Sequence, residues 1–367
     1  MRNIIFGNGL NIEFSDKRYF NHEILKRALK KIKYNRFHSG IYAKEIGAYI
    51  KLLFEFASEL FGGEKDYLAV TSYEKRVLPA FKNRSQFAIK QKKFEFISLE
   101  DYFFLHELFC RDKDIGNPEK FYFYEFMKRL FLDSIYDDGK LNNIHKHFPC
   151  KFISWVKEFD QIFTTNYDSN IELSTGKDVY HLHGSFEVLS DVYDKNSLRN
   201  ILKLDDYDFI EGYNHLYCNA IFDFSGFGKD FKGNMANRAN SAFEKFADVY
   251  ENNELLNERE TIELLKNSSN ELERNFHKAI LHKVQNPDDE FQDYYNFDRF
   301  CSISGELVFL GLSPNNDSHI LDMVKENKNL NRIIYYYFSK SESDIFKNSF
   351  DDIEIITKNV KEFWKCF

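Results

Sequence analysis

Three polar side chains follow two apolar runs in the middle of the chain and could carry chemistry. Asn166 and Asp168 end a run that begins at Gln161, and His183 ends a run that begins at Val179. An apolar run that stops abruptly in polar residues is typical of a buried parallel strand whose carboxyl end opens into a ligand crevice. There an amide can hydrogen-bond a substrate, and an imidazole can accept a proton near neutral pH.

Two further apolar runs end in the same way. The run from Asn3 to Phe6 turns into Gly7-Asn8-Gly9-Leu10-Asn11, and the run from Glu306 to Leu312 leads through Gly311 into Ser313-Pro314-Asn315-Asn316-Asp317. Glycine after a first strand lets the backbone approach a pyrophosphate closely. The third glycine of the dinucleotide fingerprint is replaced by Ile12. Because the carboxyl ends of parallel strands meet at one edge, the sequence predicts one crevice lined by all four ends.

Each of these motifs alone also has an ordinary structural explanation. Asn166 and Asp168 suit a strand-end turn, because both side chains cap their own backbone. A single His183 is compatible with a structural role, and Asp317 suits helix capping before Ser318. It is the joint occurrence of the motifs, in this order, that favours a binding crevice.

In that order the motifs resemble the sirtuin family. Sirtuins carry an amino-terminal Gly-Ala-Gly-Ile-Ser loop, a Thr-Gln-Asn-x-Asp segment, a His-Gly strand end and a later Gly-x-Ser strand end. The counterparts here are residues 7–11, Thr164-Thr165-Asn166-Tyr167-Asp168, His183-Gly184-Ser185 and Gly311-Leu312-Ser313. The combination of Thr-Thr-Asn-Tyr-Asp with His-Leu-His-Gly looks most like the sirtuin-like domains of bacterial anti-phage and abortive-infection proteins.

The resemblance implies that NAD is the substrate and assigns roles to the matching residues. Asn166 and His183 are the expected catalytic pair, with Asn166 holding the ribose or a water and His183 acting as general base. Asp168 is expected to bind ribose hydroxyls or to orient its loop. The expected cofactor-binding residues are Gly7, Asn8, Gly9, Asn11, Thr165, Asp168, Gly311, Ser313 and Asp317. Backbone N–H groups of Gly7, Gly9 and Asn11 would face the pyrophosphate, and Gly311 and Ser313 would line the adenosine side.

Two departures from the sirtuin pattern argue against protein deacylation. Sirtuin deacylases carry paired Cys-x-x-Cys zinc ligands, whereas none of the five cysteines of this chain forms such a pair. They also carry Phe-Gly-Glu soon after His-Gly, where this chain has Ser185-Phe186-Glu187-Val188. We therefore expect no zinc ribbon, no metal, and an NAD glycohydrolase that releases nicotinamide and ADP-ribose and depletes NAD in antiviral defence.

Two alternatives remain open. The chain could be a non-catalytic sensor or scaffold subunit that binds NAD or ADP-ribose. It could also be a metal-dependent hydrolase, because His181 and His183 lie two apart on a strand and could share a metal with His215 or an Asp.

Apolar periodicity predicts an α/β fold with a parallel sheet and large helical insertions. The resemblance implies that the sheet is Rossmann-like and of the sirtuin type. Residues 1–20, 155–190 and 300–367 form the expected core of a single sirtuin-like domain, and 21–154 form a helical insertion. Residues 191–299 are expected to form a loop and a second helical insertion, with Phe222 to Gly233 as a lid. Apolar residues recur at helical spacing from Tyr42 to Phe61, the segment from Ser318 to Glu326 also reads as a helix, and Phe94 to Ile97 suggests a short strand.

Composition limits the partners. The formal net charge is −8 without a long basic tract, which gives no support for nucleic-acid binding. No signal-peptide pattern and no run long enough to cross a bilayer is present, so a cytoplasmic location without membrane contact is expected. No second sensing domain is evident. Control by homo-oligomer formation or by a separate activating protein, of ATPase or nuclease type, is therefore the expectation.

Overall fold

The computed structural model describes residues 1–38, 40–203, 209–224, 227–252, 255–292, 295–314, 316–350 and 353–367. Its centre is a six-stranded sheet in which every pair of neighbouring strands is parallel. The strands are β1 (Arg2–Phe6), β2 (Gln161–Thr164), β3 (Tyr180–His181), β4 (Gly305–Leu310), β5 (Leu330–Tyr337) and β6 (Glu354–Asn359). The predicted α/β class and parallel sheet are confirmed, and the architecture is Rossmann-like.

The strand order is β3-β2-β1-β4-β5-β6, so the direction of winding reverses between β1 and β4. Ile4 of β1 pairs with Ile162 of β2 on one side and with Val308 of β4 on the other. A reversal of this kind leaves a crevice outside the carboxyl ends of the two central strands. The predicted strand ends after Phe6 and Leu310 therefore flank the crevice.

The two faces of the sheet are covered by different helices, and the side chains of β1 alternate between them. Ile4 and Phe6 belong to one core, which continues into the first insertion. Ile5 belongs to the other core, together with Phe309 and Tyr335. The helices in the sheet-forming part are α1 (Gly9–Glu13), α7 (Cys150–Lys157), α8 (Asn170–Thr175), α14 (Phe297–Cys301), α15 (Ser318–Glu326), α16 (Lys340–Lys347) and α17 (Val360–Trp364).

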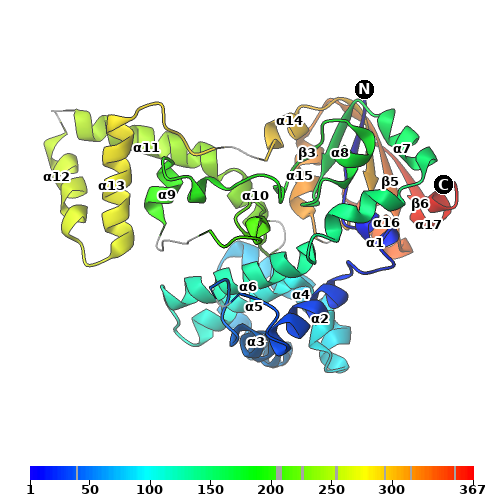
Figure 1. The fold of residues 1–367 in the computed structure, drawn as a ribbon, viewed down its shortest axis with the longest axis horizontal. Coiled ribbons are helices and arrows are strands. Elements are labelled where there is room, and N and C mark those ends of the chain that lie inside the picture. The colour runs from blue at the N-terminus through cyan, green and yellow to red at the C-terminus, as the bar shows by residue number, and fades with distance from the viewer. Residues whose placement is uncertain are drawn as a thin grey trace.

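The first insertion is helical, as predicted, and lies below the sheet in Figure 1. Its elements are α2 (Asn21–Lys33), α3 (Ile46–Phe61), η1 (Asp66–Leu68), α4 (Ser72–Lys90), η2 (Phe94–Phe96), α5 (Leu99–Asp112), α6 (Glu119–Tyr136) and η3 (Leu141–His147). The predicted strand over Phe94 to Ile97 is wrong. That segment is a single 3-10 turn between α4 and α5, and its backbone carbonyl at Phe94 accepts the Tyr102 hydroxyl at 2.8 Å instead of a strand partner.

The second insertion extends to the left in Figure 1 and is built around a core of its own, which includes Leu198, Phe243, Ile280 and Phe291. Its elements are η4 (Asp191–Tyr193), α9 (Leu198–Leu202), η5 (Asn214–Leu216), α10 (Phe227–Gly233), α11 (Met235–Glu251), α12 (Leu256–Leu264), η6 (Leu265–Asn267) and α13 (Glu271–Gln285). The predicted lid segment contains α10, while Ser225 and Gly226 lie outside the described residues.

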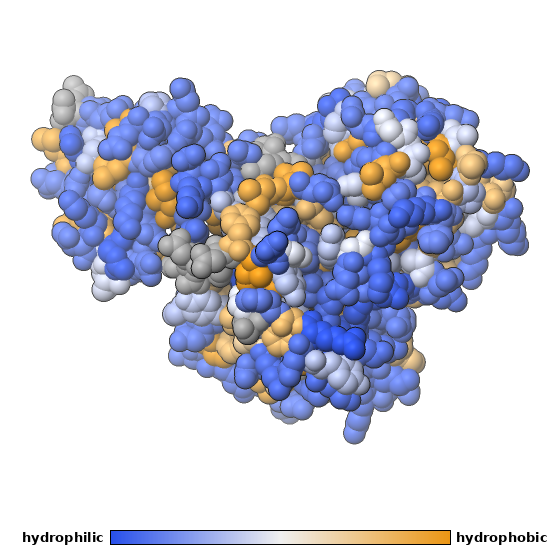
Figure 2. Space-filling view, in the orientation of Figure 1, coloured by the Kyte–Doolittle hydropathy of each residue, from blue (hydrophilic) through white to orange (hydrophobic). Residues whose placement is uncertain are grey.

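The face of the molecule in Figure 2 is largely hydrophilic, with apolar side chains in separate groups. Exposed apolar side chains include Leu256 and Leu264 of α12, at 58 % and 74 %. Within the described part of the chain, no helix combines the length and the apolar character that crossing a bilayer requires.

Candidate functional site

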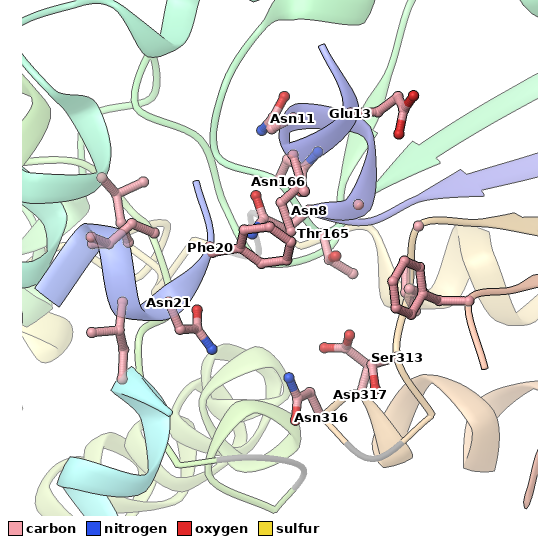
Figure 3. A pocket seen from close by; sticks show the side chains of 18 of the residues that line it. Asn8, Asn11, Glu13, Phe20, Asn21, Thr165, Asn166, Ser313, Asn316 and Asp317 are labelled. Atoms are coloured by element: carbon pink, nitrogen blue, oxygen red, sulfur yellow. The ribbon is translucent and has the colours of Figure 1, made fainter. Parts of the chain in front are cut away.

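A cavity of about 800 Å³ lies at the carboxyl edge of the sheet. Ligand pockets in proteins occupy roughly 300–1,000 Å³, so the volume of this cavity lies within that range and leaves room for a dinucleotide. Every predicted site residue except Gly7 lines this cavity. In Figure 3, Asn8, Thr165 and Asn166 lie on one side, Ser313, Asn316 and Asp317 on the opposite side, and Phe20 and Asn21 between them. Tertiary structure thus brings together residues far apart in the sequence.

Asn166 is held at the end of β2 by two hydrogen bonds. Its backbone N–H donates to Thr164 Oγ1 at 3.0 Å, and its side-chain Nδ2 donates to the carbonyl of Gly7 at 3.3 Å. The second bond ties the amide to the end of β1, the other strand at the crevice. Asn166 is 8 % exposed, so the amide is ordered yet borders the cavity.

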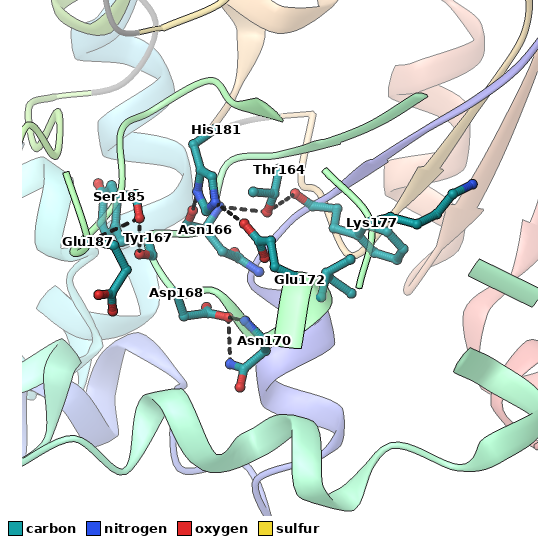
Figure 4. Close-up of polar contacts among 12 residues, drawn as sticks. Thr164, Asn166, Tyr167, Asp168, Asn170, Glu172, Lys177, His181, Ser185 and Glu187 are labelled. Atoms are coloured by element: carbon teal, nitrogen blue, oxygen red, sulfur yellow. Dashed lines mark hydrogen bonds and ion pairs between the residues drawn. The ribbon is translucent and has the colours of Figure 1, made fainter. Parts of the chain in front are cut away.

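The His181 side chain contacts the backbone carbonyl of Asn166 (Figure 4). Its Nδ1 lies 2.9 Å from the Asn166 carbonyl oxygen and its Nε2 lies 2.6 Å from Glu172 Oε1. Burial lowers the pKa of His181, but the hydrogen bond and charge of Glu172 raise it more, so the net shift is upward. Both ring nitrogens face acceptors, which favours the doubly protonated imidazolium.

Asp168 is buried beneath the strand end and both of its oxygens accept hydrogen bonds within the chain. Asn11 Nδ2 donates to Oδ2 at 2.6 Å. The backbone N–H and Nδ2 of Asn170 donate to Oδ1 at 3.1 and 2.5 Å, as Figure 4 shows. Burial raises the pKa of Asp168, and these hydrogen bonds oppose the shift. The contacts suit loop orientation, the second of the two roles expected for Asp168. Asn11 Oδ1 is buried without a hydrogen-bond partner among the described residues.

Gly7 and Gly9 allow β1 and β4 to approach each other. Their N–H groups donate to the carbonyls of Leu310 and Gly311 at 3.0 and 2.9 Å. A Cβ added at Gly7 would lie 2.5 Å from the Gly311 oxygen, and one at Gly9 would lie 2.5 Å from the Gly311 Cα. The prediction that these two N–H groups face a pyrophosphate is therefore wrong, because the neighbouring strand end uses them.

His183 pairs with His319, a residue that the sequence analysis did not select. Their Nε2 atoms lie 2.9 Å apart and the rings are nearly parallel, at 21°. Both are buried, at 2 % and 5 % exposure. Burial and the nearby charge of Lys229 hold the pKa of both imidazoles well below the usual range, so each is neutral. The predicted helix from Ser318 to Glu326 contains His319, but periodicity does not indicate which residue meets His183.

A buried charge cluster completes the far side of the cavity. Lys229 Nζ of α10 lies 2.5 Å from Glu100 Oε1 and 3.5 Å from Asp317 Oδ1. Burial lowers the pKa of Lys229, but the two carboxylates raise it more. Burial raises the pKa of Glu100 and Asp317, and Lys229 opposes both shifts. No motif in the sequence indicates Lys229 or Glu100, since no local pattern links residues 129 positions apart.

Among the described residues, the predicted metal set of His181 and His183 with His215 or an Asp does not form. His181 contacts Glu172, and His215 Nε2 contacts Asp133 Oδ1 at 3.1 Å. A different group does offer three ligand atoms within 4.8 Å of one another, namely those of His183, Asp317 and His319, and it is the one such group in the described ranges. Two imidazoles and a carboxylate are a donor set that fits zinc or another first-row metal ion.

No protein-family model, no curated protein and no solved structure matches this chain.

Proposed function

We propose that this chain is an NAD glycohydrolase that cleaves the bond between nicotinamide and ribose and releases nicotinamide and ADP-ribose. The observation that carries the proposal is the placement of Asn166 and His183 on one cavity, at the point where the strand order reverses. Dinucleotides bind at this point of Rossmann-like sheets. The sirtuin-like order of the four strand ends supports the same substrate.

The residues suit the chemistry. Breaking a glycosidic bond develops positive charge on the ribose, as in other glycoside hydrolyses. A water oxygen bonds to the ribose carbon, and nicotinamide leaves with the electron pair of the broken bond. The water proton passes to a neutral imidazole, the form in which burial keeps His183. The Asn166 amide, fixed by Gly7, is placed to orient the water or a ribose hydroxyl.

The proposed biological role is NAD depletion in antiviral defence, within the cytoplasm. Because unrestrained NAD cleavage would kill the host, the proposal includes control by self-assembly or by a separate protein of ATPase or nuclease type. The helical insertions are the proposed contact surfaces. The sirtuin type of the sheet belongs to the same proposal.

The test is incubation of the purified protein with NAD, alone and with its neighbouring gene products, followed by product analysis. Asn166→Ala and His183→Ala should abolish release of nicotinamide while leaving the fold intact. His282→Ala is the matched control, since His282 pairs with Asp289 on the surface of α13. Turnover by both variants at the wild-type rate would overturn the proposal. Tight NAD binding without turnover would favour the sensor or scaffold alternative.

A second candidate, a metal-dependent hydrolase, is favoured by one observation, the group of His183, Asp317 and His319. The Lys229 ammonium competes for the same carboxylate, 3.5 Å from Asp317 Oδ1, which weighs against a second cation there. Metal analysis of the purified protein decides between the two. A stoichiometric transition metal that is lost in His319→Ala would establish the metal site.

A further inference from the structure

Three segments that are distant in the sequence meet at one buried ammonium. Lys229 belongs to α10 of the second insertion, Glu100 to the first turn of α5 in the first insertion, and Asp317 to the loop after β4. The Lys229 side chain is 2 % exposed, and all three residues line the cavity. The cavity wall is therefore closed by an ionic junction between the sheet and both insertions.

The junction is needed for electrostatic reasons. A buried ammonium is stable only when it is paired, and two carboxylates close together repel each other unless a cation lies between them. Lys229 meets both needs, with 2.5 Å to Glu100 and 3.5 Å to Asp317. Loss of the ammonium would leave two buried carboxylates without a counter-ion at the edge of the cavity.

The position of Asp317 determines the position of the histidine pair through the first turn of α15. It is the N-cap residue of α15, and its carbonyl accepts the N–H of Ile320 at 3.1 Å and of Leu321 at 3.4 Å. His319 lies in that first helical turn and contacts His183. A shift of Asp317 therefore moves the turn that carries His319.

Helix α10 is itself anchored at two further points. Lys232 Nζ lies 2.9 Å from Asp223 Oδ2 and donates to the hydroxyl of Tyr124 at 2.5 Å. At the end of the helix, a Cβ added at Gly233 would lie 2.0 Å from the ring of Phe297. These contacts fix the helix axis, so that Lys229 presents its ammonium at a defined place.

We propose that Lys229 is a positioning residue that orders Asp317 and, through the first turn of α15, the His319–His183 pair. Both insertions must dock for the pair to be ordered, which makes them part of the site and gives a partner bound to either one a route to it. The proposal rests on the proposed function for its kinetic consequence, but the ordering of the two imidazoles is independent of the substrate.

The test compares Lys229→Met with Lys325→Met, a loss of charge on the exposed side of α15, where Lys325 Nζ lies 3.0 Å from Asp322 Oδ1. Lys229→Met should lower kcat for NAD cleavage by about tenfold or more with little change in KM, the coupling expected of contacting groups. Lys229→Arg should recover part of kcat. Lys325→Met should leave kcat unchanged. Adding Asp317→Asn to Lys229→Met should lower kcat by less than the product of the two single effects, because both act through the same contact.

A second measurement keeps the inference testable without turnover. Ring 15N chemical shifts of His183 and His319 should change in Lys229→Met and stay at the wild-type positions in Lys325→Met. If wild-type protein does not consume NAD and the shifts still respond in this way, the proposed function fails and the positioning role stands. Unchanged shifts in Lys229→Met, or equal kinetic effects of the two variants, would overturn the positioning role.

Discussion

Two buried clusters in this chain use the same residue types and differ in how fully they are paired. In the first insertion, Asp133 contacts Lys31 Nζ at 2.8 Å, His215 Nε2 at 3.1 Å and the Tyr42 hydroxyl at 3.1 Å. At the sheet edge, Lys229 and two histidines surround Asp317, but the nearest ammonium contact is 3.5 Å.

The electrostatic outcomes are opposite. Burial raises the pKa of Asp133, but His215 and Lys31 lower it more, so the net shift is downward. Burial also raises the pKa of Asp317, and there the Lys229 contribution is the smaller one, so the net shift is upward. Saturated pairing favours the ionised carboxylate, and incomplete pairing does not.

The two clusters also differ in how many of their buried polar atoms have hydrogen-bond partners. The Asp133 cluster satisfies both carboxylate oxygens and does not line the cavity. At the sheet edge, Glu100 Oε2 and His319 Nδ1 are buried without a hydrogen-bond partner among the described residues. Unsatisfied polar atoms cost free energy, so their retention beside a cavity indicates a site that a ligand completes.

The largest expected effect is on catalysis. His183→Ala should lower kcat for NAD cleavage by about 10²- to 10⁴-fold, the usual contribution of a general base. His215→Ala removes the same residue type from the saturated cluster and should leave kcat of the folded protein near the wild-type value. Steady-state kinetics on protein of confirmed fold measures both. A similar loss of kcat in the two variants would erase the functional distinction between the clusters.

The next effect is on stability, and here the larger loss is expected in the Asp133 cluster. Asp133→Ala leaves Lys31 and His215 buried without their partner, and the free energy of unfolding should fall by about 3–5 kcal/mol. Asp317→Asn keeps the shape and removes a charge that burial already disfavours, so its loss of stability should be smaller. Urea unfolding provides the comparison. A larger loss for Asp317→Asn would contradict it.

The two clusters should also respond oppositely to pH. The folded-state pKa of Asp133 lies below its usual value of 3.8, so its stabilising contribution is present above pH 3.8 and is lost as pH falls through the folded pKa. The folded-state pKa of Asp317 lies above 3.8, so its contribution is present below pH 3.8 and is lost as pH rises through the folded pKa. The free energy of unfolding should be measured over a pH series. Asp133→Asn should weaken its dependence on pH below pH 3.8, and Asp317→Asn should weaken its dependence on pH above pH 3.8.

The smallest effect concerns the backbone after β3. Gly184 has φ +82°, and a Cβ there would lie 2.5 Å from the Asn219 carbonyl oxygen, whereas Gly176 has φ +67° with open space around it. Gly176→Ala should cost about 1–2 kcal/mol from conformation alone. Gly184→Ala should cost more and should also reduce NAD binding, because it displaces the turn that follows His183. Equal unfolding midpoints for the two variants would contradict the prediction, because they would show that the turn after His183 accommodates a Cβ without further cost.

Sequence patterns were sufficient for the sheet because they are local. Apolar runs that end in polar residues located the ends of β1, β2 and β4, and helical spacing placed the helix from Ser318 to Glu326 at its observed bounds. The same local reasoning failed for Phe94 to Ile97. A short apolar run does not distinguish a strand from a 3-10 turn, and this segment packs beside α2 and α4.

The sequence by itself determined the parallel α/β architecture and placed Asn166 and His183 at strand ends. Only the tertiary structure decided that the Gly7 and Gly9 N–H groups pair with β4, that His181 lies behind Asn166, and that Lys229 joins Glu100 to Asp317. The physical reason is range. Periodicity follows from interactions along the backbone, whereas buried charge pairs and histidine contacts depend on which elements pack together.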